Sequence, residues 1–232
     1  MITTSLLCAL ALASAPADFD AFISDYSAAL RSATWQDWYV DNSWTGETHG
    51  TQVAPFTDIQ AAIGFVAASN GNFAADTLYV RDSGIPYHGP IVFPNMNALR
   101  LEGWGGRPTV TLTGAVAAST IMSGSNYFSA EYACMPPAQV GLKNLRIENF
   151  STIPGHFCAD IQTWVSWENA DPARHRYGVS NVVFDGGGAQ GGVRLRDLDQ
   201  GHMVPWGIPY NNFHTSMVQA CRFETCATGV EI

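Results

Sequence analysis

Four segments of the chain repeat one pattern of apolar and polar positions. The clearest is 142–149 (Leu-Lys-Asn-Leu-Arg-Ile-Glu-Asn), and the pattern returns at 96–103, 179–186 and 218–225. Each segment has an apolar residue, two polar or small residues, and then an apolar-x-apolar-acid run. Alternation with a period of two predicts a short strand with one buried face. Strands that return with the same pattern predict a β-solenoid, in which equivalent positions stack on successive turns.

The outward positions of these strands are expected to form two charged columns, with neighbours about 4.8 Å apart. The columns are Arg100, Arg146, Val183 and Arg222, and Glu102, Glu148, Asp185 and Glu224. Two interpretations stay open. One is a solvated ion-pair ladder. The other is a functional surface, where the arginines bind uronate carboxylates of a polymer or the acids bind Ca²⁺.

A second strand is expected after each copy, followed by a long return. The second strands are 109–112, 192–195 and 229–232, with 159–162 as an offset candidate after the second copy. The long segments between strand pairs are 113–141, 163–178 and 196–217. Insertions at one place in a repeat gather on one side of a solenoid. We therefore expect these segments to line one trough.

The N-terminal part carries different signals. Residues 1–17 have a short apolar core and end in Ala-Pro-Ala, which predicts a signal peptide and a secreted protein. Residues 18–75 are expected to form a helical cap region. A helix at 18–35 is followed by one at 58–68, opened by a capping box of Thr57 and Gln60. Such a helix can cover the open end of a solenoid.

Several short motifs then follow one another in a recognisable order. They are Tyr-Val-Asp at 39–41, Pro-Phe-Thr-Asp-Ile-Gln-Ala-Ala-Ile at 55–63, Asp-Thr-Leu-Tyr-Val-Arg at 76–81 and Tyr-His-Gly at 87–89. This order resembles the entry of pectate-lyase-like right-handed parallel β-helix proteins, and 221–230 is similar to a typical turn of that fold.

The resemblance implies an all-β fold, a right-handed parallel β-helix (β-solenoid) with an N-terminal α-helical cap. The helix would occupy 76–232, and because Ile232 lies inside an expected strand, we expect it to be truncated at the C-terminus. The resemblance does not fix an activity, because that superfamily contains lyases, hydrolases, esterases, epimerases, phage spikes and adhesins. No catalytic motif of the family is matched, so none of its catalytic residues is carried over.

Composition and net charge limit the classes of binding partner that the protein can have. A net charge of −9 argues against nucleic acid and against an anionic membrane surface. With 47% hydrophobic and only 13% charged residues, the chain is expected to fold. Charged rather than apolar outward positions favour a monomer over a trimeric spike.

The long segments hold the candidate chemistry, because their Trp, Tyr, His, Arg and acidic residues suit a polysaccharide. Aromatic rings stack on sugar faces, and polar side chains bind sugar hydroxyls. The expected substrate-binding residues are Trp164, Trp167, Arg174, Arg194, Arg196, Trp206 and Tyr210. The expected catalytic residues are His175, Arg176, Asp197, Asp199 and His202.

The favoured reaction is β-elimination on a uronate-containing glycan, which makes the protein a polysaccharide lyase. It needs a base for the C5 proton and a cation on the carboxylate, either a basic side chain or Ca²⁺. One alternative is a non-catalytic adhesin or tailspike-like glycan-binding protein. A second is a glycoside hydrolase, because Asp197 and Asp199 on one strand face would be about 6.6–7 Å apart.

Four cysteines follow the expected signal peptide, at 134, 158, 221 and 226, which permits three pairings into two disulfides. A Cys134–Cys158 bond would join two loops, and a Cys221–Cys226 bond would brace a turn. Asn149-Phe150-Ser151 is a glycosylation sequon.

Overall fold

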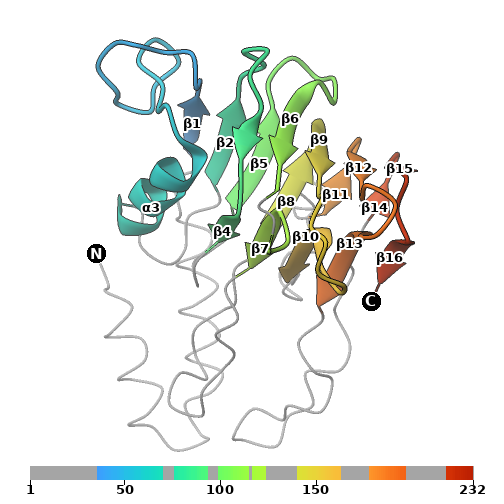
Figure 1. Ribbon diagram of the computed structural model, residues 1–232. Coiled ribbons are helices and arrows are strands. Elements are labelled where there is room, and N and C mark those ends of the chain that lie inside the picture. Colours follow the sequence, from blue (N-terminus) through green and yellow to red (C-terminus); the bar gives the residue numbers. More distant parts are fainter. Residues whose placement is uncertain are drawn as a thin grey trace, which may run out of the picture.

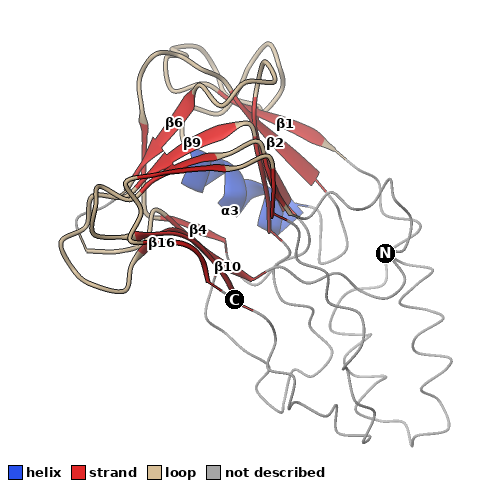
Figure 2. Cartoon of the chain, turned by 90° about the vertical axis from the view of Figure 1, so that its right-hand side faces the viewer, coloured by secondary structure: helices blue, strands red, loops and turns tan. Residues whose placement is uncertain are grey.

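The protein folds as a parallel β-solenoid of three sheets, as a computed structural model shows (Figures 1 and 2). The structure describes residues 36–69, 76–93, 99–114, 117–123, 140–162, 178–196 and 218–231. Every pairing between its named strands is parallel. The expectation of an all-β parallel solenoid is therefore confirmed.

From β2 onward each turn contributes one strand to each sheet, and β1 adds a sixth strand to sheet 1. Sheet 1 contains β1 (Asp37–Val40), β2 (Asp76–Val80), β5 (Leu99–Gly103), β8 (Val140–Lys143), β11 (Val179–Ser180) and β14 (Val218–Gln219). Sheet 2 contains β3 (Tyr87–His88), β6 (Val110–Thr113), β9 (Leu145–Glu148), β12 (Val183–Asp185) and β15 (Arg222–Glu224). Sheet 3 contains β4 (Ile91–Phe93), β7 (Ile121–Ser123), β10 (Phe157–Gln162), β13 (Gly191–Arg196) and β16 (Thr228–Glu231).

Columns of like residues fill the space between the sheets, which Figure 2 shows as three walls around the core. In sheet 1 the register stacks Leu78, Leu101, Leu142 and Val179, and none of them is exposed. Sheet 3 stacks Ile91, Ile121, Ala159 and Val193 in the same way. The period-two alternation thus arises because one position in two faces this core.

Three of the four repeated segments turn out to be two strands rather than one, whereas the first, 96–103, contains β5 alone. Asn144, Asn181 and Ala220 have positive φ angles of 57°, 52° and 53°, and at each of them the chain turns from sheet 1 to sheet 2. The two polar or small residues of the pattern include this corner. The interpretation of these three segments as single strands was wrong, because the pattern shows the inward positions but not the bend.

The register of the first copy was also wrong. Arg100 lies in sheet 1 and pairs with Gly141, so it is not in the column of Arg146. Thr111 of β6 takes that place instead. The other three copies are aligned as expected, with Arg146 beside Val183 and Val183 beside Arg222. An apolar-x-apolar-acid run suits either sheet, so the pattern alone could not assign the first copy.

Only some of the expected second strands lie in the sheet in which they were expected. The offset candidate 159–162 is confirmed as part of β10, which pairs with β13, and β13 pairs with β16. The candidate 109–112 is confirmed as a strand, but it is not equivalent to the other second strands, because Val110–Thr113 is β6 of sheet 2 and pairs with β9. In that turn the strand of sheet 3 is β7.

The helix expected near 58–68 is α3 (Ile59–Ser69). Its first turn is capped by Asp58, whose carboxylate accepts the Ala61 N–H at 2.7 Å. The capping box of Thr57 and Gln60 was therefore wrong. The Gln60 amide instead pairs with the Val92 backbone, accepting its N–H at 2.7 Å and donating to its carbonyl at 2.9 Å. Gln60 thus satisfies part of the free edge of β4, at the end of sheet 3.

The apolar face of α3 joins the solenoid core through Ile59, Ala62, Ile63 and Val66. The expected signal peptide at 1–17 and helix at 18–35 lie outside the described residues. Among the residues that are described, no helix combines the length and the apolar character needed to cross a bilayer.

Asn149 of the sequon is fully buried. Its amide donates to the carbonyls of Ala118 and Phe157 at 2.9 Å each, and its oxygen accepts the Ser151 N–H at 2.8 Å. In the folded protein the Asn149 amide is therefore not accessible for glycosylation. Its hydrogen bonds instead fix the backbone at this corner of the solenoid.

Asp41 fixes the end of β1 to the end of β2. Its carboxylate accepts the N–H and the hydroxyl of Ser43 at 2.9 and 2.6 Å, and it pairs with Arg81 at 3.0 Å. Burial would raise the pKa of this carboxyl, but the bonds from Ser43 and Arg81 outweigh burial and hold the pKa below its ordinary value.

Replacing Asp41 by Asn should cost about 1–2 kcal/mol of unfolding free energy at neutral pH. Because the folded pKa of Asp41 is lowered, its contribution is present above the unfolded value of 3.8 and is lost as the pH falls through the lower, folded value. Urea unfolding over a pH series should show the two proteins converging below that range. Asp37→Asn, at an exposed position of β1, is the control, and a gap that stays constant at low pH would contradict the prediction.

Ala220→Asn should stabilise the fold by about 1 kcal/mol, because Asn tolerates the left-handed backbone that Ala220 adopts. At the equivalent corner, the Asn181 amide donates to the Asn144 side-chain oxygen at 2.8 Å, and an Asn at 220 can continue this ladder. Chemical denaturation measures the change. Ala220→Val should destabilise, since a β-branched residue is strained there, and equal midpoints for both variants would disprove the account.

Candidate functional site

Most residues expected to form the site lie outside the described residues. This holds for the catalytic candidates His175, Arg176, Asp197, Asp199 and His202, and for Trp164, Trp167, Arg174, Trp206 and Tyr210. Arg196 ends β13, and its side chain is likewise outside the description. Among the predicted residues, the structure places only the Arg194 side chain.

Arg194 lies on the outer face of sheet 3 and is engaged by its neighbours. Its Nε donates to Glu231 at 2.7 Å, and its Nη1 lies 3.6 Å from an Asp160 oxygen. The guanidinium also lies 4.2 Å from the centre of the Phe157 ring. These contacts join β10, β13 and β16, so Arg194 has a structural role in addition to any role in binding.

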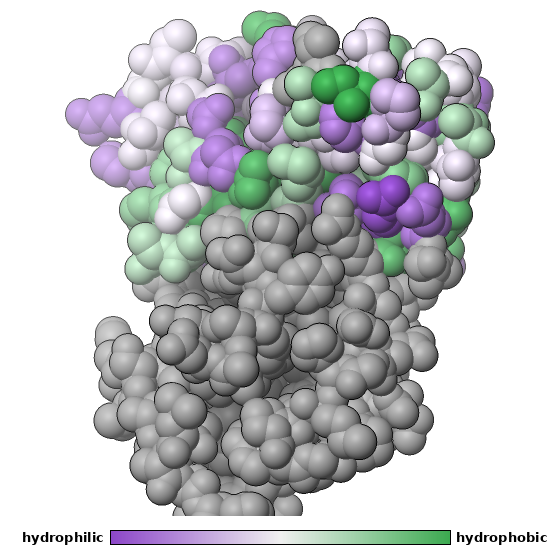
Figure 3. All heavy atoms as spheres, turned by 60° about the horizontal axis from the view of Figure 1, so that its bottom comes forward, coloured by the Kyte–Doolittle hydropathy of each residue, from purple (hydrophilic) through white to green (hydrophobic). Residues whose placement is uncertain are grey.

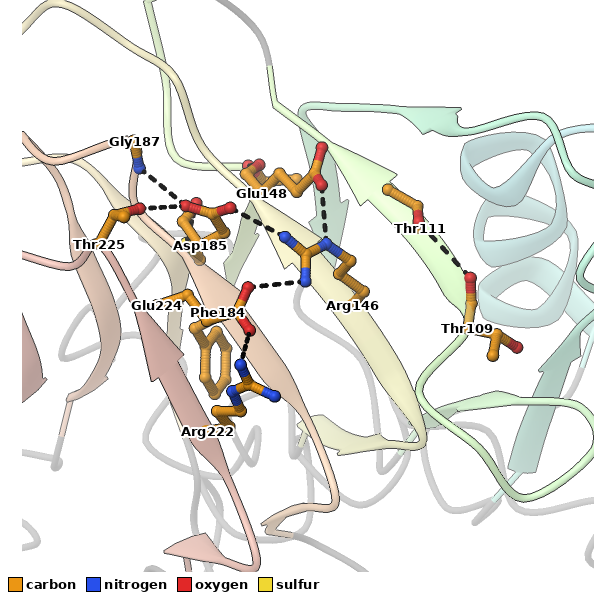
Figure 4. Close-up of polar contacts among 12 residues, drawn as sticks. Thr109, Thr111, Arg146, Glu148, Phe184, Asp185, Gly187, Arg222, Glu224 and Thr225 are labelled. Atoms are coloured by element: carbon orange, nitrogen blue, oxygen red, sulfur yellow. Dashed lines mark hydrogen bonds and ion pairs between the residues drawn. The ribbon is translucent and has the colours of Figure 1, made fainter.

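The outer face of sheet 2 carries a closed ion-pair network (Figure 4). The Arg146 guanidinium donates to Glu148 at 2.8 Å, to Asp185 at 2.8 Å and to Glu224 at 2.9 Å, so it bridges acids of three successive turns. Hydrogen bonding to Glu148, followed by Glu224, raises the pKa of Arg146 although burial opposes the shift. Arg222 also pairs with Glu224 at 2.8 Å.

The acids of this network are satisfied by protein groups. Asp185 also accepts the Gly187 N–H at 3.2 Å and the Thr225 hydroxyl, both drawn in Figure 4. With two arginines and three acids, the network carries one excess negative charge. The face therefore shows an ion-pair ladder rather than a receptor for uronate. Within the described ranges, no group of three or more His, Cys, Asp or Glu residues could hold a metal ion such as Ca²⁺.

The outer face of sheet 1 differs, because it begins with an aromatic platform formed by Tyr39, Tyr79 and Trp104. Tyr39 and Tyr79 are register partners on β1 and β2, and their rings stack with centroids 5.5 Å apart. The Trp104 ring lies 5.4 Å from that of Tyr39 and is 36% exposed. Burial, followed by Asp37 and Tyr79, raises the pKa of the Tyr39 hydroxyl, so it stays a hydrogen-bond donor near neutral pH.

A charged cluster of Arg100, Glu102 and Lys143 continues this face. Tyr79 pairs with Glu102, and Glu102 pairs with Lys143, so the platform and the cluster share one row across β2, β5 and β8. Glu102 lies 2.7 Å from Arg100 and 3.0 Å from Lys143. Asn144 also donates to Glu102 at 3.2 Å.

The cluster contains one acid for two cations. It therefore carries one excess positive charge, whereas the networks around Arg146 and Arg194 are each negative by one. The Lys143 side chain is 41% exposed. Among the described residues the Arg100 Nε has no hydrogen-bond partner, but it is buried and therefore closed to a ligand at this face. The exposed Asp37 lies in the same row as Arg100, so Asp37 and Glu102 balance Arg100 and Lys143 on this face. An anionic ligand would therefore be repelled less by sheet 1 than by the two faces that are negative by one.

No protein-family model, no curated protein and no solved structure matches this chain. The fold is accordingly stated as the structure gives it, a parallel β-solenoid.

One feature of the sequence indicates the aromatic platform, although the alternation of apolar and polar positions does not reveal it. The dipeptide Tyr-Val occurs at 39–40 and again at 79–80, and the two copies are register partners. Identical dipeptides at the ends of two successive expected strands indicate stacking. Trp104, which follows β5, has no such signal.

Replacing Arg146 by Met should lower the unfolding free energy by about 2 kcal/mol near pH 7, because three carboxylates lose their common partner. Urea unfolding near pH 7 measures this loss. Arg222→Met is the matched control: its side chain is 75% exposed, so it should change stability by no more than about 0.5 kcal/mol. Equal losses in the two variants would rule out the bridging role.

Proposed function

We propose that the outer face of sheet 1 binds a polysaccharide. The observation that carries the proposal is the single row formed by the aromatic platform and the charged cluster. Sugar rings have apolar faces that stack on Tyr and Trp, while their hydroxyls and carboxylates need donors. Tyr39, Arg100 and Lys143 offer such donors beside the rings.

The geometry suits a chain-like ligand. Successive strands of sheet 1 are about 4.8 Å apart, comparable with the length of one pyranose residue. A glycan that follows the row would present successive sugars first to the rings of β1 and β2 and then to the cations of β5 and β8. The excess positive charge of the cluster favours an acidic, uronate-containing glycan over a neutral one.

We propose β-elimination as the reaction on this glycan. A base removes the C5 proton, the C4=C5 double bond forms, and the glycosidic oxygen on C4 leaves with a proton. A cation on the carboxylate, supplied by an arginine, a lysine or Ca²⁺, makes the C5 proton more acidic. The candidates for base and cation are His175, Arg176 and His202 with Arg174, together with Asp197 and Asp199 as acidic partners.

Chain connectivity supports these candidates. The segment 163–178 leaves β10 of sheet 3 and enters β11 of sheet 1, and 196–217 leads from β13 to β14 in the same way. Both segments therefore end at the border of the sheet 1 face.

We propose the pectate-lyase-like architecture for the whole chain: a right-handed, secreted β-helix whose N-terminal end is covered by α3. Supporting this, α3 contributes four residues to the core, and Figure 2 shows it in line with the space that the sheets enclose. A monomer is supported by the charged outward positions of sheet 2 and by the mixture of hydrophilic and hydrophobic residues on the face in Figure 3.

A non-catalytic glycan receptor is the second candidate. The charge pairing favours it, because Arg100 and Lys143 both pair with Glu102. Among the described residues, no side chain is positioned as a base at the platform. Such a protein would use the same row for adhesion.

Ultraviolet absorbance separates the two candidates, because a lyase produces an unsaturated uronate at the newly formed chain end. The full chain should raise the absorbance of pectate, alginate or a glycosaminoglycan, and EDTA added in parallel shows whether a divalent cation takes part. Retention of a glycan without new absorbance would favour the receptor. Neither retention nor absorbance on any acidic glycan would contradict the proposed function.

Tyr79→Ala should weaken binding of the retained glycan about tenfold, which corresponds to ~1.4 kcal/mol, because one stacking ring is lost. Affinity electrophoresis in gels containing the glycan measures the change. Phe150→Ala removes a more exposed ring, away from sheet 1 in the β9–β10 connection, and is the control. If both variants bind alike, the platform is not the binding surface.

A further inference from the structure

In the described part of sheet 1, the exposed cations of the outer face lie on every second strand. Arg81 comes directly after β2, where its N–H continues the ladder to the Val40 carbonyl at 2.9 Å, and its side chain is 59% exposed. By alternation it shares the outer side of Tyr79. Lys143, at the end of β8, is the second exposed cation. Because the strand order is β1-β2-β5-β8, two strand spacings, about 9.6 Å, separate these cations along the stack.

The described residues of β1 and β5 offer a bound anion no such cation. On β5, Arg100 and Glu102 lie 2.7 Å apart with side chains only 14% and 10% exposed, so they neutralise each other below the surface. On β1 the exposed charge is Asp37, an acid two residues before Tyr39. Burial, followed by the charge of Asp37, raises the pKa of the Tyr39 hydroxyl, so the platform at β1 lies in the field of an acid.

Both exposed cations can bind a ligand while they keep their partners in the protein. The Arg81 Nη1 donates to the Asp41 carboxylate at 3.0 Å, and the Lys143 Nζ lies 3.0 Å from a Glu102 oxygen. A guanidinium has five N–H groups and an ammonium has three. The protein carboxylates therefore hold the two cations in position, and the other N–H groups can donate to a carboxylate of the ligand.

We propose that the glycan bound by sheet 1 carries a uronate at every second sugar, with an uncharged sugar between; this rests on the function proposed above. One strand spacing is comparable with one pyranose residue, so cations two strands apart match carboxylates two sugars apart. The uncharged sugars then lie at β1, where their hydroxyls can donate to Asp37, and at β5.

A homopolymer of uronates fits this face less well. Each intervening carboxylate would lie beside Asp37 or over the Arg100–Glu102 pair, where the described residues provide no exposed cation to compensate it. Like charges brought together at an interface oppose binding. The order of charges along the strands therefore selects a glycan by the spacing of its carboxylates and not by their number.

Affinity electrophoresis of the full chain tests this with two glycans at equal carboxylate concentration. In hyaluronan a uronate alternates with an uncharged sugar, whereas in polymannuronate every sugar is a uronate. Hyaluronan should be bound about tenfold more tightly. Charge density alone would favour the homopolymer, so the expected order cannot arise from non-specific attraction. If the glycans are cleaved, initial rates of new ultraviolet absorbance should follow the same order.

Two matched variants test the spacing directly. Ser180 and Gln219 continue the row of Lys143 on β11 and β14, one and two strands further along. Gln219→Lys places a new cation two strands from Lys143 and should strengthen hyaluronan binding about tenfold. Ser180→Lys adds the same charge one strand away, so it should favour polymannuronate instead. Lys143→Gln should remove the preference for hyaluronan, and Lys143→Arg should keep it.

The possible failures are distinguishable. Equal binding of the two glycans by the wild type, or equal gains of hyaluronan binding in Gln219→Lys and Ser180→Lys, would overturn the alternation and leave the proposed function intact. A preference for hyaluronan that survives in Lys143→Gln would also overturn it. If no acidic glycan is retained at all, the proposed function fails, and this inference fails with it.

Discussion

Parallel stacking of backbones in register is the constraint on which this structure depends. Each residue has a neighbour of equivalent position about 4.8 Å above and below it, so any property of a side chain is repeated along the stack. Inside, repetition is favourable: Leu78, Leu101 and Leu142 form a continuous apolar column. Outside, repetition of charge is unfavourable, and Arg146 offsets it by bridging the acids of three turns.

The same constraint explains how much of the fold the sequence could predict. Alternation identifies inward positions without further information, so the strands, their parallel stacking and three of the four repeated segments were predicted. The corners were not, because a bend depends on one backbone angle, as at Asn144. The first segment was misassigned for this reason: a longer connection, rather than a one-residue corner, joins β5 to β6.

The site was harder to predict than the fold. Sequence reasoning favoured segments dense in Trp, His and Arg, and it weighed single residues by type. The platform instead joins Tyr39 to Tyr79, which are ordinary strand residues until the register makes them neighbours. Stacking brings residues that are far apart in the sequence together on one surface. A binding face of a solenoid can therefore be recognised only after the turns have been aligned.

Charge compensation also decides which outer face can bind an anion. Around Arg146 and around Arg194 the acids outnumber the cations, and each guanidinium is held by carboxylates of neighbouring turns. On sheet 1 the stack places two cations around Glu102, and the exposed Asp37 in the row of Arg100 makes the described charges of this face sum to zero. In a protein with a net charge of −9, the rest of the surface repels a polyanion. Under the proposed function, an acidic polymer would therefore meet less repulsion at the face where the aromatic rings lie than at the other two outer faces.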